Sequence, residues 1–444
     1  MEGDSSTSSV EQKIHGWKRA GSVVMSRGLR DYPTDPQSPR QTDHEEEDSN
    51  TIRRYKTIKG VMGPLYIDYM DLQIKKKLGE GAFAQVYHGV LTTEDIPKPG
   101  KDVAVKMLKH EHLKNMSEVF MFLKEFKTLK HLHHPSIVQL IGIGGVQNAE
   151  GSVVEMFIVT EICRGGTLRS LVQDQMITVF RKQYSLYDAV RWSLQIAEAL
   201  NYLHRCVPIV IHRDLKLENI ILTDNPRHTS SFLSKGKDAP VVDAKLADFG
   251  LATLLATPQK QLHTTFSGYM KRSSHDSPTK AKSNKVIGML ERMRTFSSFG
   301  SMSGESISSG PVEMTGVAGS YGYMAPEVFR DEQYNEKVDI FSFGVVVYNL
   351  CYRVIPALTI MSNGDCEDMV AYAKRVADGF RQPLNNDKIP AELNSIIEDC
   401  WRDNPSDRPG ANNVVERLRR FMDSGALDHE ESSPSSSSCC CSLM

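Results

Sequence analysis

The sequence predicts an α+β protein of two lobes, a small β-rich lobe followed by a larger helical lobe. Segments 71–78, 84–91 and 102–108 are short stretches whose residue pattern is typical of strands. Only one helical segment, 117–132, accompanies them, whereas apolar residues recur at helical spacing through much of the chain after residue 186. We expect small ligands to bind where the two lobes meet.

The helical assignments depend on apolar spacings of 3 and 4. In 117–132 these residues are Phe122, Phe126, Leu129 and Leu132. Segment 186–206 carries Val190, Leu194, Ala197, Leu200 and Leu203 on one face, and 391–403 and 412–422 behave likewise.

The composition is that of an ordinary globular protein. The chain has 444 residues, 40% hydrophobic and 24% charged, and a formal net charge of -2. This length can bury more than one core, and the near-balance of charge gives no argument for nucleic acid or an anionic surface as partner.

No apolar run is long enough to predict a membrane span. The best candidate, 339–361, contains Arg353 and Pro356 and is better interpreted as a buried core helix. The N-terminus lacks a secretory pattern, so we expect a cytoplasmic, reducing location. No C-x-x-C pair predicts zinc, and we expect Cys163, Cys206, Cys351, Cys366 and Cys400 to be mostly small buried hydrophobes.

The chain divides by composition into a folded region and polar ends. Residues 1–60 are polar with an acidic run, which predicts a disordered tail. The folded region is expected at 67–424, with a long flexible insert at 257–310 that is rich in Ser and Thr. Residues 425–444 form a second disordered tail, rich in Ser and Cys.

A glycine-rich stretch between two strands is the first candidate for chemistry. In "LGEGAFAQV", Gly79 and Gly81 would let the backbone approach a phosphate; the alternative is a glycine-rich hairpin. Lys106 lies in the apolar strand "VAVK", where an ammonium group needs an anionic partner. Glu125 on the following helix could supply that carboxylate.

A second cluster lies in "VIHRDLKLENIIL" and "AKLADFGLAT". Asp214 could accept a hydroxyl proton, while Lys216 and Asn219 could handle phosphate and metal. Asp248 would complete an oxygen-rich Mg²⁺ site with Asn219. Taken singly, each could be a surface turn.

Over about residues 67–424 the chain resembles the eukaryotic protein kinases. The resemblance lies in five motifs in this order: the glycine loop, "VAVK", "HRDLKLEN", "DFG" and "APE" (325–327). The resemblance implies a bilobal kinase fold with ATP and Mg²⁺ as cofactors. Lys106 would contact the ATP phosphates and pair with Glu125, Asp214 would be the catalytic base, and Lys216 would steady the transferred phosphoryl group. Asn219 and Asp248 would hold Mg²⁺.

The resemblance also implies which residues surround the nucleotide, with Thr160 as gatekeeper and a hinge at 161–163. These residues are Gly79, Glu80, Gly81, Ala82, Phe83, Val86, Ala104, Lys106, Thr160, Glu161, Cys163 and Ile221. By the same match Asp339 would brace the catalytic loop, and Glu327 would pair with Arg408.

Several features favour the tyrosine kinase-like Ser/Thr group, the Raf-like and mixed-lineage relatives. These are Lys216 in "HRDLKLEN", "DFGLAT", "GSYGYMAPEV" and "CWRDNPSDRP". Ser320 occupies the position where such kinases usually have Thr. Ala84 replaces the third glycine and Phe341 replaces a usual Trp, but neither change removes a catalytic group.

The largest departure is the distance from Asp248 to Glu327, roughly fifty residues longer than is usual. Arg213 implies a basic pocket for a phosphorylated activation segment, with Thr315 as first candidate and Thr253 as second. Chance matches are the alternative for any single site in such a Ser/Thr-rich loop.

Three adjacent cysteines in the last segment predict lipidation. Cys441-Ser-Leu-Met resembles a C-a-a-X box, which predicts a prenyl group on Cys441, although Ser442 is not aliphatic. One lipid binds membranes only marginally, so Cys439 and Cys440 are expected to add palmitoyl groups; the alternative is an unmodified end.

The sequence thus predicts a Ser/Thr signalling kinase that transfers the γ-phosphate of ATP to protein acceptors. We expect its partners to be ATP, protein substrates with Ser or Thr acceptors and an upstream kinase, but not nucleic acid. We also expect that phosphorylation of the activation segment switches its activity, and that C-terminal lipidation holds it peripherally at a cytoplasmic membrane face. The alternative is a kinase-fold membrane scaffold with little or no turnover.

Overall fold

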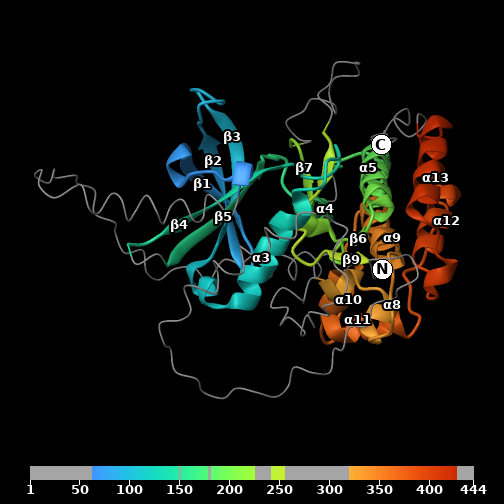
Figure 1. Ribbon diagram of the computed structural model, residues 1–444. Helices are drawn as coiled ribbons and strands as arrows, with labels where there is room; N and C mark the ends of the chain where they lie inside the picture. Colours follow the sequence, from blue (N-terminus) through green and yellow to red (C-terminus); the bar gives the residue numbers. More distant parts are fainter. Residues whose placement is uncertain (1–62, 150–151, 179–181, 226–241, 256–319, 428–444) are drawn as a thin grey trace, which may run out of the picture.

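A five-stranded antiparallel sheet forms the first part of the molecule (Figure 1). The computed structural model describes residues 63–149, 152–178, 182–225, 242–255 and 320–427. The sheet has the order β1-β2-β3-β5-β4. Its strands are β1 (Leu72–Glu80), β2 (Ala84–Leu91), β3 (Lys101–Leu108), β4 (Leu140–Gln147) and β5 (Val153–Glu161). The helix α3 (Met116–Leu129) lies beside it.

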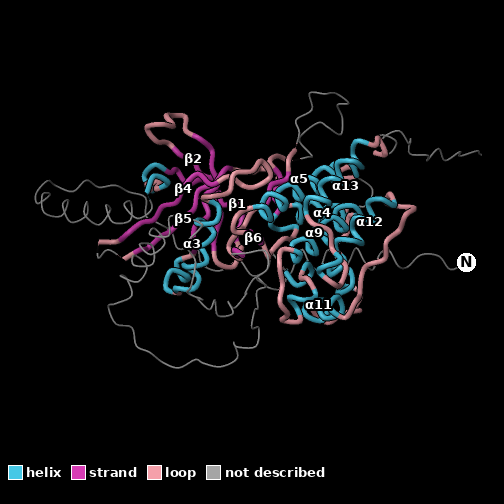
Figure 2. Tube along the Cα trace, turned by 45° about the vertical axis from the view of Figure 1, so that its right-hand side comes forward, coloured by secondary structure: helices cyan, strands magenta, loops and turns pink. Residues whose placement is uncertain are grey.

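The second part of the described chain is mainly helical (Figure 2). Its helices are α4 (Leu168–Ile177), α5 (Leu186–Arg205), α8 (Pro326–Phe329), α9 (Lys337–Tyr352), α10 (Pro356–Ser362), α11 (Met369–Ala377), α12 (Ala391–Cys400) and α13 (Ala411–Asp423). Two small antiparallel pairs join β6 (Ile209–Ile211) to β9 (Thr253–Leu255) and β7 (Ile220–Leu222) to β8 (Ala244–Leu246). The expected α+β architecture, a β-rich lobe followed by a larger helical lobe, is confirmed.

Local sequence sets the ends of these helices. Ser185 and Asp188 form a reciprocal capping box at the start of α5. The helix α9 ends where Arg353 adopts a left-handed conformation (φ 56°), and Pro356 begins α10. The apolar run 339–361 is therefore two helices, and α3 ends at Leu129, short of the expected residue 132.

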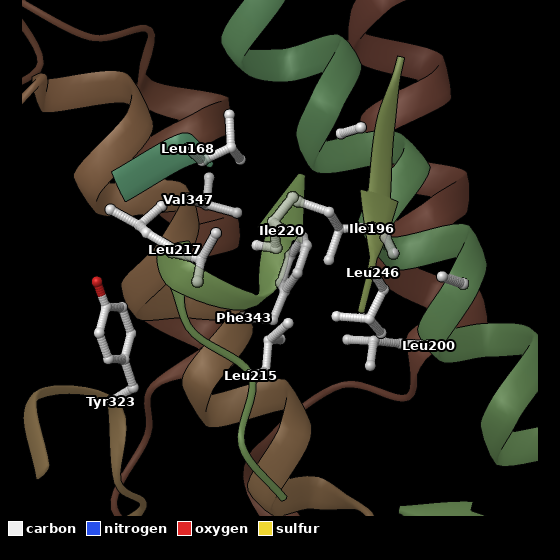
Figure 3. Packing of buried hydrophobic residues seen from close by; sticks show 14 of the residues in the cluster. Leu168, Ile196, Leu200, Leu215, Leu217, Ile220, Leu246, Tyr323, Phe343 and Val347 are labelled. Atoms are coloured by element: carbon white, nitrogen blue, oxygen red, sulfur yellow. The ribbon is translucent and has the colours of Figure 1, made fainter. Parts of the chain in front are cut away.

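The described residues form a small hydrophobic cluster within the β-rich lobe and a main cluster with residues from both lobes. In β3, Val103 and Val105 point into a small cluster with Phe157 of β5, while the alternate residues Ala104 and Lys106 face the other side. The main cluster joins the catalytic-loop residues Leu215, Leu217 and Ile220 to α9 and α5 (Figure 3). Its members from α9 and α5 include Phe343, Val347, Ile196 and Leu200. This packing fixes the segment that carries Asp214.

In the described part of the chain, no single helix has the length and apolar content of a membrane span. The pair α9 and α10 meets that criterion only when taken together, and it is bent by 72° at the break.

Several sequence predictions concern residues outside the described ranges. These are the tail 1–60, all of the insert 257–310, Thr315, and residues 428–444 with Cys439, Cys440 and Cys441.

Candidate active site

Lys106 lies between two carboxylates that come from distant parts of the chain. Its Nζ is 2.6 Å from Glu125 Oε2 on α3 and 3.2 Å from Asp248 Oδ1. Glu125 is buried, so its charge is held in place beside the sheet. The structure thus supplies the anionic partner that a lysine in an apolar strand requires.

The charges of Lys106, Glu125 and Asp248 affect one another's pKa values. Burial disfavours the ammonium form of Lys106, but Asp248 and Glu125 outweigh it and raise the pKa of the lysine. The nearby Lys106 charge lowers the pKa of Asp248, although burial opposes it. Burial raises the pKa of Glu125 against the opposing effect of Lys106. Lys106 is therefore cationic and Asp248 anionic at neutral pH, as phosphate and metal binding require.

Asp214 lies at the centre of a dense hydrogen-bond network. The Lys216 ammonium group donates to both carboxylate oxygens, at 2.9 and 2.7 Å. The hydroxyl of Ser320 donates to Oδ1 at 2.8 Å and also accepts from Lys216 at 2.9 Å. Asn219 Nδ2 donates to the Asp214 backbone carbonyl and to Oδ2. The carboxylate is thereby fixed in one orientation.

A buried aspartate holds the loop 212–219, which carries Asp214, through hydrogen bonds to its backbone. Asp339, on α9, accepts hydrogen bonds from the backbone N–H groups of His212 and Arg213, both at 2.9 Å. His204 Nε2 lies 3.0 Å from the same carboxylate. Burial opposes ionisation of Asp339, but the hydrogen bond and charge of His204 prevail and lower its pKa. Arg213 is held at φ 69°, a conformation that these bonds stabilise.

The donor set beside Asp214 fits Mg²⁺. Because Asn219 commits its Nδ2 to Asp214, its amide oxygen is the atom left for a cation. The Asp248 side chain is 48% exposed, so it can reach a ligand. No cluster of three or more His, Cys, Asp or Glu occurs among the described residues. Mg²⁺ usually binds one or two protein carboxylates plus phosphates and water, so the Asp248 carboxylate and the Asn219 amide oxygen are a suitable donor pair.

The residues expected around the nucleotide divide into an exposed group and a half-buried group. Gly79, Glu80, Gly81 and Ala82 are exposed at the turn from β1 to β2, and a Cβ at Gly79 would meet nothing within 4 Å. The half-buried group comprises Phe83, Val86, Ala104, Lys106, Thr160, Glu161, Cys163 and Ile221. Ala104 and Thr160 are direct neighbours in the β3–β5 register.

Some of these side chains have other partners. Glu80 accepts a hydrogen bond from Lys109 and another from Lys77, which together lower its pKa to about 2. Phe83 packs on the ring of His112, with centroids 5.5 Å apart. Burial raises the pKa of the Cys163 thiol to about 11, so it is not a reactive thiolate.

The side chain of Glu161, in the expected hinge, accepts hydrogen bonds from Gln139 and Lys245. Its Oε1 accepts from the backbone N–H of Gln139 and from Lys245 on β8, each at 2.8 Å. Its backbone N–H donates to the Gln139 carbonyl at 3.0 Å, and its carbonyl accepts from the Thr160 hydroxyl at 3.2 Å. One lone pair of that carbonyl is then left for a nucleotide.

The regulatory candidates are only partly described. Arg213 lies over the ring of Tyr334 at 5.5 Å and has no acidic partner among the described residues. Burial, and then the charge of Arg213, lower the pKa of Lys124 on α3 to about 8. Thr253 is half-buried in β9, opposite Ile211, and Thr315 lies outside the described ranges.

Sequence reasoning missed three contributors to the site: His204, Lys245 and Lys124. His204 reaches Asp339 across 135 residues, and Lys245 reaches Glu161 across 84. The one available signal for His204 is its place in the last turn of the helix that precedes the catalytic loop.

The fold and the site together define a protein kinase domain. The site residues that do so are Lys106, Glu125, Asp214, Asn219 and Asp248. Residues 72–272 match the family model described as protein tyrosine and serine/threonine kinase, and residues 297–418 match the protein kinase domain model. The chain belongs to the protein kinase superfamily.

Curated relatives bear Ser/Thr kinase names. The chain is 29% identical over 364 residues to serine/threonine-protein kinase CTR1 of Arabidopsis thaliana, covering 81% of this chain and 32% of that protein. It is 25% identical over 364 residues to serine/threonine-protein kinase VIK of the same species, covering 81% and 62%. These matches agree with the predicted tyrosine kinase-like Ser/Thr group.

A third relative is named dual specificity protein kinase splA, of Dictyostelium discoideum. It is 26% identical over 359 residues, which cover 81% of this chain and 12% of that protein. The chain thus spans less than two thirds of the length of all three relatives. What the comparisons identify in it is a protein Ser/Thr kinase domain.

Proposed function

We propose that this chain is a Mg-ATP-dependent protein kinase that transfers the γ-phosphate of ATP to Ser or Thr of protein acceptors. The observation that carries the proposal is the pair formed by Asp214 and the Ser320 hydroxyl, 2.8 Å apart. It shows how an O–H group approaches this carboxylate. An acceptor hydroxyl at a similar distance would be within range to give its proton to Asp214.

The other residues divide the remaining work. Lys106, kept cationic by Glu125, binds the phosphates of ATP, and Lys216 stabilises charge on the transferred group. Asn219 and Asp248 would hold Mg²⁺, which supplies charge to offset that on the phosphate oxygens. Because Lys216 contacts both Asp214 and Ser320, the hydroxyl of a short Ser or Thr side chain is the acceptor that we assign.

We also propose that phosphorylation of the activation segment, by an upstream kinase or by the chain itself, raises activity. Arg213 and Lys124 form a basic pair with no acidic partner among the described residues, and a phosphate would neutralise it. Thr315 is the first candidate for that phosphate. Thr253 is the second, but its place in a paired strand makes it less accessible.

Attachment to a cytoplasmic membrane face is a proposal that rests on sequence alone. Three adjacent cysteines, Cys439 to Cys441, supply thiols for more than one lipid. Mass spectrometry of this segment from eukaryotic cells, compared with a variant in which all three are Ser, tests it. Unmodified thiols in the wild type would contradict it.

Phosphate transfer to a pool of Ser- and Thr-containing peptides tests the main proposal. The purified full chain is incubated with Mg-ATP beside Asp214→Asn and the matched control Asp378→Asn, an exposed aspartate at the end of α11. We expect transfer by the wild type and the control only. Equal phosphorylation by Asp214→Asn would overturn the proposal, and ATP binding without transfer by the wild type would favour the scaffold.

A further inference from the structure

An ion pair joins the sheet to the segment that follows the expected hinge. The guanidinium group of Arg164 donates a hydrogen bond to Oδ2 of Asp102, which lies 62 residues earlier in β3. Arg164 directly follows the expected hinge 161–163. The pair therefore spans the point about which the two parts of the chain would move apart.

The backbone of Arg164 belongs to the helical part. Its N–H group donates to the carbonyl of Thr223 at 3.0 Å, and the N–H group of Gly165 donates to the carbonyl of Leu222, in β7, at 2.9 Å. A Cβ on Gly165 would lie 2.1 Å from the carbonyl oxygen of Asp224, so glycine is needed for this close approach. Arg164 is thus attached to β7 and not to the sheet.

Asp102 belongs to the sheet, on the face that carries Lys106. Side chains alternate along β3, so Asp102, Ala104 and Lys106 share one face. The buried Val103 and Val105 point to the other face. Because Ala104 and Lys106 are expected to contact the nucleotide, Asp102 lies at the end of that row. The ion pair is therefore at the edge of the proposed nucleotide site.

His88 holds the second oxygen of the same carboxylate. Its Nε2 lies 2.7 Å from Asp102 Oδ1, and its register partner in β3 is Ala104. The two oxygens of Asp102 are thereby divided between a partner from its own sheet and a partner from the helical part. The hydrogen bond of His88, and then the charge of Arg164, lower the pKa of Asp102. The carboxylate is therefore ionised at neutral pH, as pairing with Arg164 requires.

The pair of Lys106 and Asp248 also joins the sheet to the segment after β8. We assign these two side chains to phosphate and Mg²⁺, so a bound nucleotide competes with their mutual contact. Neither Asp102 nor Arg164 is assigned to phosphate or metal. Their pair can therefore persist while nucleotide is bound.

We infer that Asp102 and Arg164 form an interlobe latch that slows the release of nucleotide, and that His88 is a positioning residue for Asp102. The side chains of Arg164 and Asp102 are 54% and 44% exposed. Exposed ion pairs are weak, so the latch changes the release rate about two- to fivefold. This inference rests on the proposed kinase activity and adds to it the residues that control how long nucleotide stays bound.

Stopped-flow release of methylanthraniloyl-labelled ADP from the full chain, with Mg²⁺ present, tests the latch. Asp102→Asn and Arg164→Gln should each release the probe about two- to fivefold faster than the wild type. The double variant should release it no faster than either single variant, because both substitutions break the same pair. Asp378→Asn breaks an exposed pair at the end of α11 and, as the control, should match the wild type.

Other results would overturn the latch. Unchanged release in Asp102→Asn would do so, and faster release in Arg164→Gln alone would instead indicate direct contact between Arg164 and the nucleotide. Effects that multiply in the double variant would show that the two residues act separately. In each of these cases peptide phosphorylation by the wild type would leave the proposed function standing. A wild type that neither binds the probe nor transfers phosphate would overturn both.

Ionic strength gives a readout that a merely structural role would not move. Raising NaCl from about 50 mM to about 500 mM screens an exposed ion pair. Release should therefore accelerate more in the wild type than in the double variant. Equal acceleration in the two proteins would refute an electrostatic latch. Circular dichroism melting confirms that each variant is folded.

Two substitutions test the part played by His88. His88→Ala removes the donor that orients Asp102 and should speed release about twofold. His88→Gln retains a side-chain N–H donor and should stay near the wild type. Equal release rates in the two variants would contradict the positioning role.

Discussion

The Lys106 ammonium group lies 2.6 Å from Glu125 and 3.2 Å from Asp248, joining β3, α3 and the segment after β8. This contact places the cation that we propose to bind phosphate against the proposed metal ligand. It also makes the position of α3 part of the active site, because movement of α3 removes the partner of Lys106.

Glu125→Gln should lower kcat/KM for ATP about 10–100-fold, because a neutral amide holds Lys106 less firmly than a carboxylate. Steady-state kinetics at varied ATP measure this. Glu118→Gln, in the first turn of the same helix, is the control and should stay near the wild type. An unchanged kcat/KM in Glu125→Gln would show that the pair does not act in catalysis.

Ser320→Ala should lower kcat about fivefold, since Asp214 loses a hydrogen bond of about 1 kcal/mol that orients it. Ser320→Thr retains the hydroxyl and should keep kcat within about threefold. Comparing the two variants separates orientation from packing. Equal loss in both would contradict a role for the hydroxyl.

Glu327→Gln should destabilise the protein by about 3–5 kcal/mol, because it leaves the buried Arg408 charge without its partner. The two groups make paired contacts of 2.7 and 2.8 Å, and both are almost fully buried. Urea unfolding measures the loss. Asp378→Asn breaks an exposed pair and should cost less than about 1 kcal/mol. Similar losses in both variants would refute this account.

Lys124→Met should raise the free energy of unfolding at pH 7 by roughly 1–3 kcal/mol, because burial and Arg213 disfavour the ammonium form. The folded-state pKa is about 8 against 10.5 for an ordinary lysine. The unfolded chain therefore binds more protons between these values, and wild-type stability gains with rising pH across that window.

In Lys124→Met this contribution to the pH dependence should disappear. Urea unfolding at pH 7, 8, 9 and 10 measures it, with the exposed Lys130→Met as control. If both variants have the same pH dependence as the wild type, Lys124 is not strained by its surroundings.

Much of the site was predictable because its residues lie in short, ordered segments. Because side chains alternate along β3, Lys106 lies on the face of the sheet away from the buried Val105. The apolar spacing of α3 turns Glu125 toward Lys106. The interruption of the run 339–361 was also visible in Arg353 and Pro356.

The unpredicted parts depend on contacts between distant segments. The partners His204–Asp339 and Lys245–Glu161 arise from packing of whole elements, which no local pattern encodes. The lowered pKa of Lys124 likewise requires Arg213 and the burial of α3.

The central claim is that Asp214 supports phosphate transfer by this chain. The most direct measurement is mass-spectrometric mapping of phosphate on the purified full chain after incubation with Mg-ATP, with ATP affinity measured in parallel. We predict new phosphate on Ser or Thr in the wild type, Thr315 among the sites, and none in Asp214→Asn at unchanged ATP affinity. The same phosphate in Asp214→Asn would contradict the claim.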